Sequence, residues 1–327
     1  MKYLNPMADL TFKKVFGEHP DLVTSFLNAL LPFETPEEEI TEIEYLPAEL
    51  VPETPFKKNS IVDVRCKDKQ GRQFLVEMQM FWSSSFMQRV LFNASKTYVR
   101  QLGKNAHYEL LQPVYSLNLV NEIFLPDIPG YYHDYRIVQV EHTDKIIEGL
   151  RFIFIELPKF TPKAYGDKKM QVLWLRYLTE IDEDTRQVAP DLLENPSIKK
   201  AVEQIEESSF TDAQLFGYDD FWDAVRVEKS YISDAKREGK QKGLKEGLER
   251  GIQKGMRKGM KQGIKQGIKE GIQKGIEQGI QKGIEQGVTK GKEEERLQIA
   301  HKMETEGIAI EVIERITGLT RDEINAL

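Results

Sequence analysis

The feature of this sequence that most restricts how the chain can fold is a glycine repeat near its C-terminus. Glycine recurs at every fourth position from Gly239 to Gly291, fourteen times without interruption. Leu, Ile, Met or Val follows every glycine from Gly243 to Gly287, and the remaining positions carry mostly Lys, Gln, Glu and Arg. In an α-helix four residues advance about 400°, so the glycine stripe and the apolar stripe both drift by about 40° per repeat.

A helix with this repeat needs a partner to be stable. Each glycine costs about 1 kcal/mol relative to alanine in a helix interior, which gives about 14 kcal/mol for the whole repeat. Burial by a second helix would stabilise each following apolar residue by roughly 1.5–3 kcal/mol. We therefore predict a long helix that self-associates into a homo-oligomer, and a period above 3.6 favours right-handed winding of the partner. The alternative is a flexible linker.

The distribution of charge points to DNA as a partner, although the net charge is −7. Residues 1–235 carry 26 Lys and Arg against 38 Asp and Glu, whereas residues 236–292 carry 16 against 6 and residues 293–327 carry 4 against 9. The basic charge is thus concentrated in the repeat, where it can bind phosphates without sequence preference.

Two absences limit the cellular context. The sequence has no run of eighteen apolar residues, so no membrane span is expected. Its N-terminal stretch lacks the apolar core of a signal peptide, which favours a cytoplasmic location. The single cysteine, Cys66, excludes an internal disulfide and is expected to be a small core residue.

A β-hairpin is predicted between Ser60 and Met80. Both arms alternate apolar and polar residues, and the polar segment from Asp68 to Gly71 supplies a turn with a glycine. One face of the hairpin is expected to be apolar and to carry the following side chains: Val62, Val64, Cys66, Phe74, Val76 and Met78.

The polar face of this hairpin carries a candidate metal site. If the hairpin is symmetric about Gln70, Asp63 lies across from Glu77, and opposed side chains have Cβ atoms about 4.5–5.5 Å apart. Like charges at that distance repel, and a divalent cation between them would turn the repulsion into binding. Carboxylate oxygens are ligands that Mg²⁺ or Mn²⁺ prefers. The alternative is that both acids serve only solubility.

The spacing of these residues resembles a known nuclease signature. Asp63, followed after thirteen residues by Glu77-Met78-Gln79, is similar to the PD-(D/E)XK signature, with Gln79 where lysine is usual and Val62 in place of the proline. Further matching segments are Asn5-Pro6-Met7-Ala8-Asp9, Phe12-Lys13-Lys14-Val15-Phe16, Gln101-Leu102 and Tyr108. Over roughly residues 1–160 the chain resembles the Rpn family of recombination-promoting nucleases, also called PD-(D/E)XK family transposases.

The resemblance implies an α/β fold with an αβββαβ core and a metal-dependent DNA endonuclease. It implies Asp63, Glu77 and Gln79 as catalytic residues, with Mg²⁺ or Mn²⁺ held by Asp63, Glu77 and the backbone carbonyl of Met78. Asp9 is expected either to add a further acid to this site or to cap the first helix.

Periodicity predicts the elements around the hairpin. Helices are expected at 9–16, 20–31 and 85–102, and strands at 40–45, 113–124 and 151–157, the last with no assigned partner. The helix at 85–102 carries Arg89 and two further cations on polar positions, which either contact phosphate or form a solvated face. An aromatic group at Phe216, Tyr218, Phe221 and Trp222 is expected to pack on the core.

Four regions follow from these patterns. We predict a nuclease-like domain at 1–165, an α-helical subdomain at 166–235, the basic glycine repeat as a helix or linker at 236–292, and a small helical motif at 293–327. In the last region, Gly318 is expected to end one helix, and Thr320 with Glu323 is expected to form a capping box that begins the next. Two short helices around a glycine turn suggest a helix-turn-helix. Its acidic charge favours packing or dimerisation over DNA recognition.

Two further functions fit parts of the sequence. The first is a DNA-binding or self-assembling protein whose nuclease site is weak or inactive, because the neutral Gln79 cannot stabilise negative charge as lysine would. The second, a glycosidase with paired carboxylates, is disfavoured because the hairpin lacks aromatic residues for a sugar, apart from Phe81 and Trp82.

Overall fold

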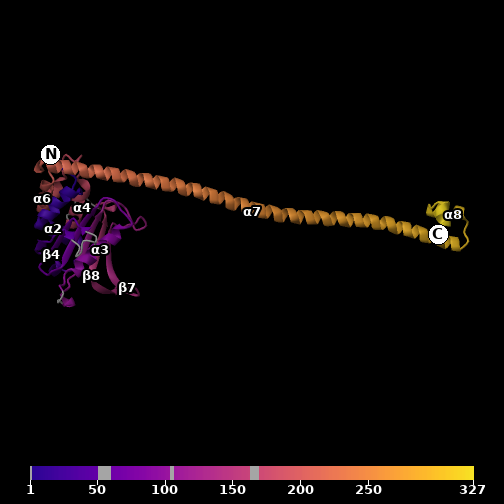
Figure 1. Ribbon diagram of the computed structural model, residues 1–327, viewed down its shortest axis with the longest axis horizontal. Coiled ribbons are helices and arrows are strands. Elements are labelled where there is room, and N and C mark those ends of the chain that lie inside the picture. Colours follow the sequence, from indigo (N-terminus) through magenta and orange to yellow (C-terminus); the bar gives the residue numbers. More distant parts are fainter. Residues whose placement is uncertain (1, 51–59, 104–106, 163–168) are drawn as a thin grey trace. The chain divides into compact units, whose positions relative to one another are not determined.

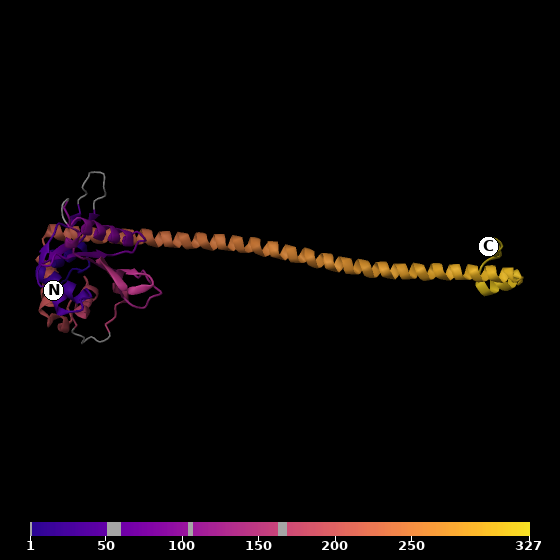
Figure 2. The ribbon, with the colours of Figure 1, turned by 90° about the horizontal axis from the view of Figure 1, so that it is seen from below.

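The computed structural model describes residues 2–50, 60–103, 107–162 and 169–327. The chain forms two compact units, Met1–Asp234 and Ala235–Leu327. The first unit holds a mixed β-sheet with helices on both faces, and the second is helical (Figures 1 and 2).

A six-stranded sheet forms the centre of the first unit. Its order is β1-β4-β5-β6-β8-β7, so β1 and β7 are the edges. Strands β1, β4 and β5 pair antiparallel, β5, β6 and β8 run parallel, and β7 is antiparallel to β8. The strands are β1 (Ile43–Tyr45), β4 (Val64–Asp68), β5 (Gln73–Gln79), β6 (Val114–Val120), β7 (Tyr132–Gln139) and β8 (His142–Glu156). A separate pair joins β2 (Glu49–Leu50) to β3 (Ser60–Ile61).

Helices cover both faces of this sheet. One face packs against α1 (Asp9–Glu18), α2 (Pro20–Leu30), α4 (Met170–Glu180) and α6 (Pro196–Gln204), and Figure 1 shows α2, α4 and α6 grouped together. The other face packs against α3 (Phe86–Val99). Short helices complete the unit: η1 (Pro36–Glu38), η2 (Tyr108–Leu110), η3 (Leu157–Lys159), α5 (Pro190–Leu193) and η4 (Glu207–Ser209).

The predicted mixed α/β core is therefore confirmed, and it contains helix, three strands, helix and strand as α2, β1, β4, β5, α3 and β6. Strand β5 lies inside the sheet and is buried on both faces. Phe74 and Val76 face the large core with α1 and α2, while Leu75 packs against Ala94 of α3.

The β4–β5 turn has the chemistry expected from the sequence. Gly71 has φ +85°, a left-handed conformation that favours glycine. Asp68 accepts hydrogen bonds from the backbone N–H groups of Gln70 at 3.0 Å and Arg72 at 2.9 Å, and its other oxygen binds the Arg72 side chain at 2.6 Å. Cys66 is buried, as predicted, and burial raises the pKa of its thiol to about 12.

The first arm of the hairpin differs from the prediction in one respect. The sequence placed Val62, Val64 and Cys66 on one face, but the chain bends at Asp63, and β4 begins only at Val64. Val62 consequently packs on the α3 face with Leu75, whereas Val64 and Cys66 face the opposite core. A strand keeps its alternation only while its backbone stays extended, and the bend interrupts it.

The strand expected at 151–157 is longer and better connected than predicted. It is the end of β8, which pairs with β6 on one side and with the unpredicted β7 on the other. The outer parts of β7 and β8 carry mostly exposed residues, so they lack the burial alternation that identifies a strand in sequence.

The helical region after the sheet shares its core. Trp174, Tyr177 and Ile198 lie in the same apolar cluster as the strands of the sheet. Three of the four aromatic residues noted in the sequence, Tyr218, Phe221 and Trp222, pack with Leu4 and Ala8 as expected. The fourth, Phe216, is exposed.

The second unit contains most of α7 (Asp212–Thr305), which begins in the first unit, together with α8 (Ile310–Thr317) and α9 (Arg321–Asn325). The glycine repeat lies within α7, and the apolar residue after each glycine from Gly243 to Gly287 is exposed. The segment from Glu293, predicted as a separate helix, continues α7 because no helix-breaking residue follows Gly291 before Thr305.

The C-terminal helices form a small core of their own. Ala300, Ile313 and Ile324 are fully buried in it, and Leu319 packs with them. Gly318 ends α8 in the left-handed conformation, and the Thr320–Glu323 capping box starts α9, both as predicted.

Candidate active site

The register of the hairpin brings Asp63 and Glu77 to neighbouring positions. Val64 pairs with Val76 and Cys66 with Phe74, which is the symmetry about Gln70 that the sequence predicted. Asp63 stands in the bend immediately before Val64, next to the last paired residues.

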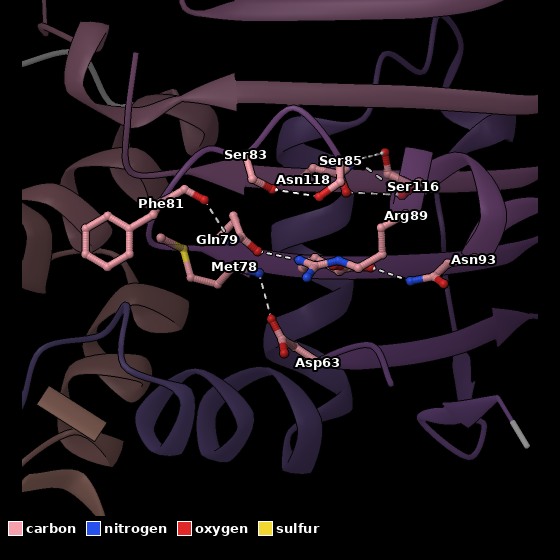
Figure 3. A network of polar contacts seen from close by, with 11 residues as sticks. Asp63, Met78, Gln79, Phe81, Ser83, Ser85, Arg89, Asn93, Ser116 and Asn118 are labelled. Carbon is pink, nitrogen blue, oxygen red and sulfur yellow. Dashed lines mark hydrogen bonds and ion pairs between the residues drawn. The ribbon is translucent and has the colours of Figure 1, made fainter. Parts of the chain in front are cut away.

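Asp63 is held to the end of β5 by its side chain. Its Oδ2 accepts a hydrogen bond from the backbone N–H of Met78 at 2.7 Å (Figure 3). Burial raises the pKa of Asp63 to about 6, because the Met78 hydrogen bond only partly offsets the loss of water, and the charge of Asp9 raises it further.

Glu77 is more deeply buried, with 6% of the residue exposed. Asn93 of α3 donates a hydrogen bond to its Oε1 at 3.0 Å. Burial raises the pKa of Glu77, the Asn93 hydrogen bond and the Arg89 charge lower it, and the Asp63 charge raises it. The two carboxylates therefore lie close enough for the charge of Asp63 to act on Glu77.

Gln79, the third residue of the signature, contacts a cation. The Arg89 guanidinium donates a hydrogen bond to Gln79 Oε1 (Figure 3). The same guanidinium nitrogen lies 3.6 Å from Glu77 Oε2. Gln79 Nε2 donates to the backbone carbonyl of Phe81 at 2.7 Å, which fixes the orientation of the amide.

Asp9 lies near this group without contacting it directly. Its carboxylate forms an ion pair with Lys13 at 2.7 Å on the surface of α1, while its charge acts on Asp63. The capping alternative is wrong, because the N-cap of α1 is Ala8 and Asp9 is the first helical residue.

The sequence indicated Arg89 only as a cation on a helix and did not indicate Asn93, and the structure brings both residues to this site. They stand four positions apart on α3 and therefore on one face of the helix, the face turned to Glu77. The i, i+4 spacing was visible in the sequence, but nothing in it indicated that this face meets the hairpin.

Glu156 is a buried carboxylate elsewhere in the first unit, and its pKa is shifted in the opposite direction to those of Asp63 and Glu77. Glu156, at the end of β8, receives hydrogen bonds from the backbone N–H groups of Phe124 at 2.6 Å and Leu125 at 3.0 Å, and it contacts His133 at 2.8 Å and Lys159 at 2.5 Å. Although burial raises its pKa, these partners lower it overall. The hydrogen bonds and cations around Asp63 and Glu77 offset the effect of burial only partly, so their pKa values are raised. Raised pKa values of this kind are typical of functional carboxylates.

The donor set fits a hard divalent cation that keeps some of its water. Within the described residues, no group of three or more His, Cys, Asp or Glu side chains is arranged to hold a metal. Two carboxylates suffice for Mg²⁺, which is commonly bound by one or two carboxylates, with waters and substrate phosphates completing its coordination. A cation there would compensate the two buried negative charges, for which Arg89 at 3.6 Å is a partial substitute.

Among the described residues, no helix is both long enough and apolar enough to cross a membrane. The exposed apolar stripe of α7 alternates with charged and amide side chains throughout the repeat.

Comparison with family models gave two matches. One, described as PD-(D/E)XK nuclease family transposase, matches residues 6–235. The other, described as Rpn/YhgA-like nuclease family, C-terminal HTH domain, matches residues 293–327. No curated protein and no solved structure matched the chain.

Proposed function

Because the chain belongs to the PD-(D/E)XK nuclease transposase family, we propose that it is a metal-dependent DNA endonuclease of the recombination-promoting type. The family resemblance seen in the motifs is thereby confirmed, and so is the C-terminal helix-turn-helix, a class of domain that suggests DNA binding. The observation that carries the proposal is the position of the Asp63 carboxylate, which accepts the Met78 N–H at the end of β5, next to the buried carboxylate of Glu77.

The proposed reaction is hydrolysis of a phosphodiester. The oxygen of a water molecule bonds to phosphorus while one ester P–O bond breaks, leaving a phosphate monoester. One proton of the water passes to the leaving oxygen, which becomes a hydroxyl group, and the other passes to solvent. Mg²⁺ or Mn²⁺ held by Asp63, Glu77 and the backbone carbonyl of Met78 would polarise the phosphate and lower the pKa of the attacking water.

The chain's own contacts hold these ligands in place. The Met78 N–H fixes the Asp63 carboxylate, and the Asn93 amide fixes Glu77. These two hydrogen bonds do not use Asp63 Oδ1 or Glu77 Oε2, and these are the oxygens that would hold the cation, with Arg89 3.6 Å from Glu77 Oε2. Asp9 is proposed as an additional acid that acts through its charge on Asp63.

The test is cleavage of supercoiled plasmid DNA with Mg²⁺ or Mn²⁺ and with EDTA. We expect the wild-type chain to nick DNA only with metal, and Asp63→Asn to lose this activity. Asp21→Asn is the control, because Asp21 is an exposed acid of α2 that forms an ion pair with Lys200 of α6. Metal-independent nicking, or full activity of Asp63→Asn, would contradict the proposal. Calorimetric titration with Mn²⁺ measures the metal site without relying on cleavage.

A second function deserves a separate test because of the exposed stripe of α7. Twelve apolar side chains of the repeat are exposed next to its basic residues, as expected of a chain that self-assembles and binds DNA through charge. If this is the main role, the wild-type chain binds DNA and sediments as an oligomer but does not cleave with any divalent metal.

A further inference from the structure

Arg89 is a cation that contacts two residues of the candidate active site, Gln79 and Glu77. It projects from α3, donates a hydrogen bond to Gln79 and lies 3.6 Å from Glu77. Its guanidinium also stands over the ring of Phe86, 4.9 Å from the centroid, which restricts its orientation.

The exposure of Arg89 differs from that of the acid it contacts. Its side chain is 49% exposed, whereas that of Glu77 is 8% exposed, so Arg89 extends from the buried acids to the surface that a DNA strand can reach. The other cation whose charge acts on Asp63, Lys13, is already in an ion pair with Asp9. Arginine carries five N–H donors in a planar fork that matches phosphate oxygens, and the Gln79 contact does not use them all.

We propose that Arg89 contacts the scissile phosphate and stabilises the negative charge that develops on it during hydrolysis, and that Gln79 is the residue that positions Arg89. This inference rests on the proposed function, since it assigns a substrate contact within the same site.

The chemistry of Gln79 suits this role. Its amide oxygen accepts a hydrogen bond from the guanidinium without neutralising the charge, whereas a carboxylate at this position would form an ion pair with it. The contact to the Phe81 carbonyl directs the amide nitrogen away, so that the oxygen faces Arg89. The positive charge that a lysine at position 79 would supply is thus provided by α3.

The first experiment measures steady-state cleavage by Arg89→Met and Arg89→Lys. Loss of one donor to developing negative charge lowers kcat by roughly 10²–10³-fold in well-studied cases, and we expect Arg89→Met to fall in that range. Arg89→Lys should retain part of the activity, because it keeps the charge and loses the fork. Lys200→Met is the control, since it removes an exposed cation of α6 on the opposite face of the sheet. Wild-type kcat in Arg89→Met would overturn the inference.

A charge swap separates an electrostatic role from a structural one. The double variant Gln79→Lys with Arg89→Gln moves the positive charge from α3 to β5 and keeps an amide as its partner. We expect this double variant to cleave at least tenfold faster than Arg89→Gln alone. A residue needed only for folding would not be rescued, so failure of the swap in a variant with wild-type circular dichroism would contradict the charge assignment.

A binding measurement tests the phosphate contact without cleavage. The affinity of the full chain for a short DNA duplex is measured in Ca²⁺ over a range of salt concentrations. Losing one phosphate contact reduces the slope of log K against log salt by about 0.9. We expect this reduction in Arg89→Met and its absence in Arg89→Lys, and an unchanged slope in Arg89→Met would overturn the contact. If the wild-type chain binds but never cleaves, the endonuclease proposal fails while the slope still decides the role of Arg89.

Discussion

The Asp63 carboxylate accepts the backbone N–H of Met78 at the point where β4 and β5 stop pairing. This single contact has two consequences. It satisfies a backbone donor of β5 that β4 no longer reaches, and it fixes the carboxylate beside Glu77. Local structure and the candidate site therefore depend on the same side chain.

Substitutions at Asp63 should separate these two roles. Asparagine keeps a carbonyl oxygen that can accept the Met78 N–H but removes the charge, whereas alanine leaves that donor unpaired. We expect both variants to lose metal-dependent cleavage, and only Asp63→Ala to be destabilised, by about 1–3 kcal/mol. Urea denaturation followed by circular dichroism, alongside plasmid nicking, checks this. Equal stability of the two variants would mean that the Met78 contact contributes little.

The raised pKa of Asp63 predicts a dependence of stability on pH. Burial raises the pKa to about 6 in the folded chain, from 3.8 in the unfolded one, so the folded state binds the proton more tightly. The folded state is stabilised by this tighter proton binding at a pH below 3.8, and the stabilisation is lost as the pH rises through about 6. Relative to Asp63→Asn, the metal-free wild-type chain should therefore lose about 1–3 kcal/mol between these limits.

The same pKa predicts how metal binding responds to pH. A cation must displace the proton from Asp63, so affinity for Mn²⁺ should fall as the pH drops below about 6. Calorimetry in buffers of different ionisation enthalpy should also detect released protons at that pH. An affinity that stays constant across this range would show that Asp63 is not a ligand.

Glu156 should be important for stability and not for chemistry. Its carboxylate joins β8 to the backbone of Phe124 and Leu125 and contacts His133 and Lys159. Breaking a buried ion pair by removing one partner costs about 3–5 kcal/mol, and we expect Glu156→Gln to lose that much at neutral pH. Since the folded pKa is lowered, this stability is present above the unfolded pKa of 4.5 and disappears as the pH falls through the folded value. The control is Glu44→Gln, which breaks an exposed pair with Lys67 and should change stability by less than about 1 kcal/mol.

The sequence predicted the elements whose patterns are set by burial. The alternation around Gln70 gave the hairpin register, and helical spacing gave α2 and α3, because each of these elements buries one regular face. It did not predict β7, whose exposed residues carry no such pattern, or the bend at Asp63 that moves Val62 to the other face.

The candidate site shows a second limit on what can be predicted from the sequence. Asp63 directly precedes β4, and Glu77 and Gln79 stand on the neighbouring strand β5, so their proximity follows from the register of the hairpin. Arg89 reaches the same place from a helix, and that contact depends on how α3 packs across the sheet. Tertiary packing of this kind is not encoded in the spacing of any one segment.

Glycine-to-alanine substitution in α7 tests the predicted self-association. No atom outside the local helix backbone lies within 4 Å of a Cβ placed on any repeat glycine, so alanine fits the single helix without a clash. Each substitution should stabilise an isolated helix by up to about 1 kcal/mol. If two helices instead approach closely along the glycine stripe, the added methyl groups keep them apart.

An isolated helix and a helix that self-associates along the glycine stripe predict different outcomes for the full chain with Gly259→Ala, Gly263→Ala and Gly267→Ala together. Self-association through the stripe predicts higher helicity but weaker oligomerisation by sedimentation. The control changes Gln262→Ala, Gln266→Ala and Lys269→Ala, which also raises helix propensity but leaves the glycines in place. A wild-type chain that sediments as a monomer at all concentrations would exclude the assembly and leave the glycine repeat as a basic helix without a partner helix.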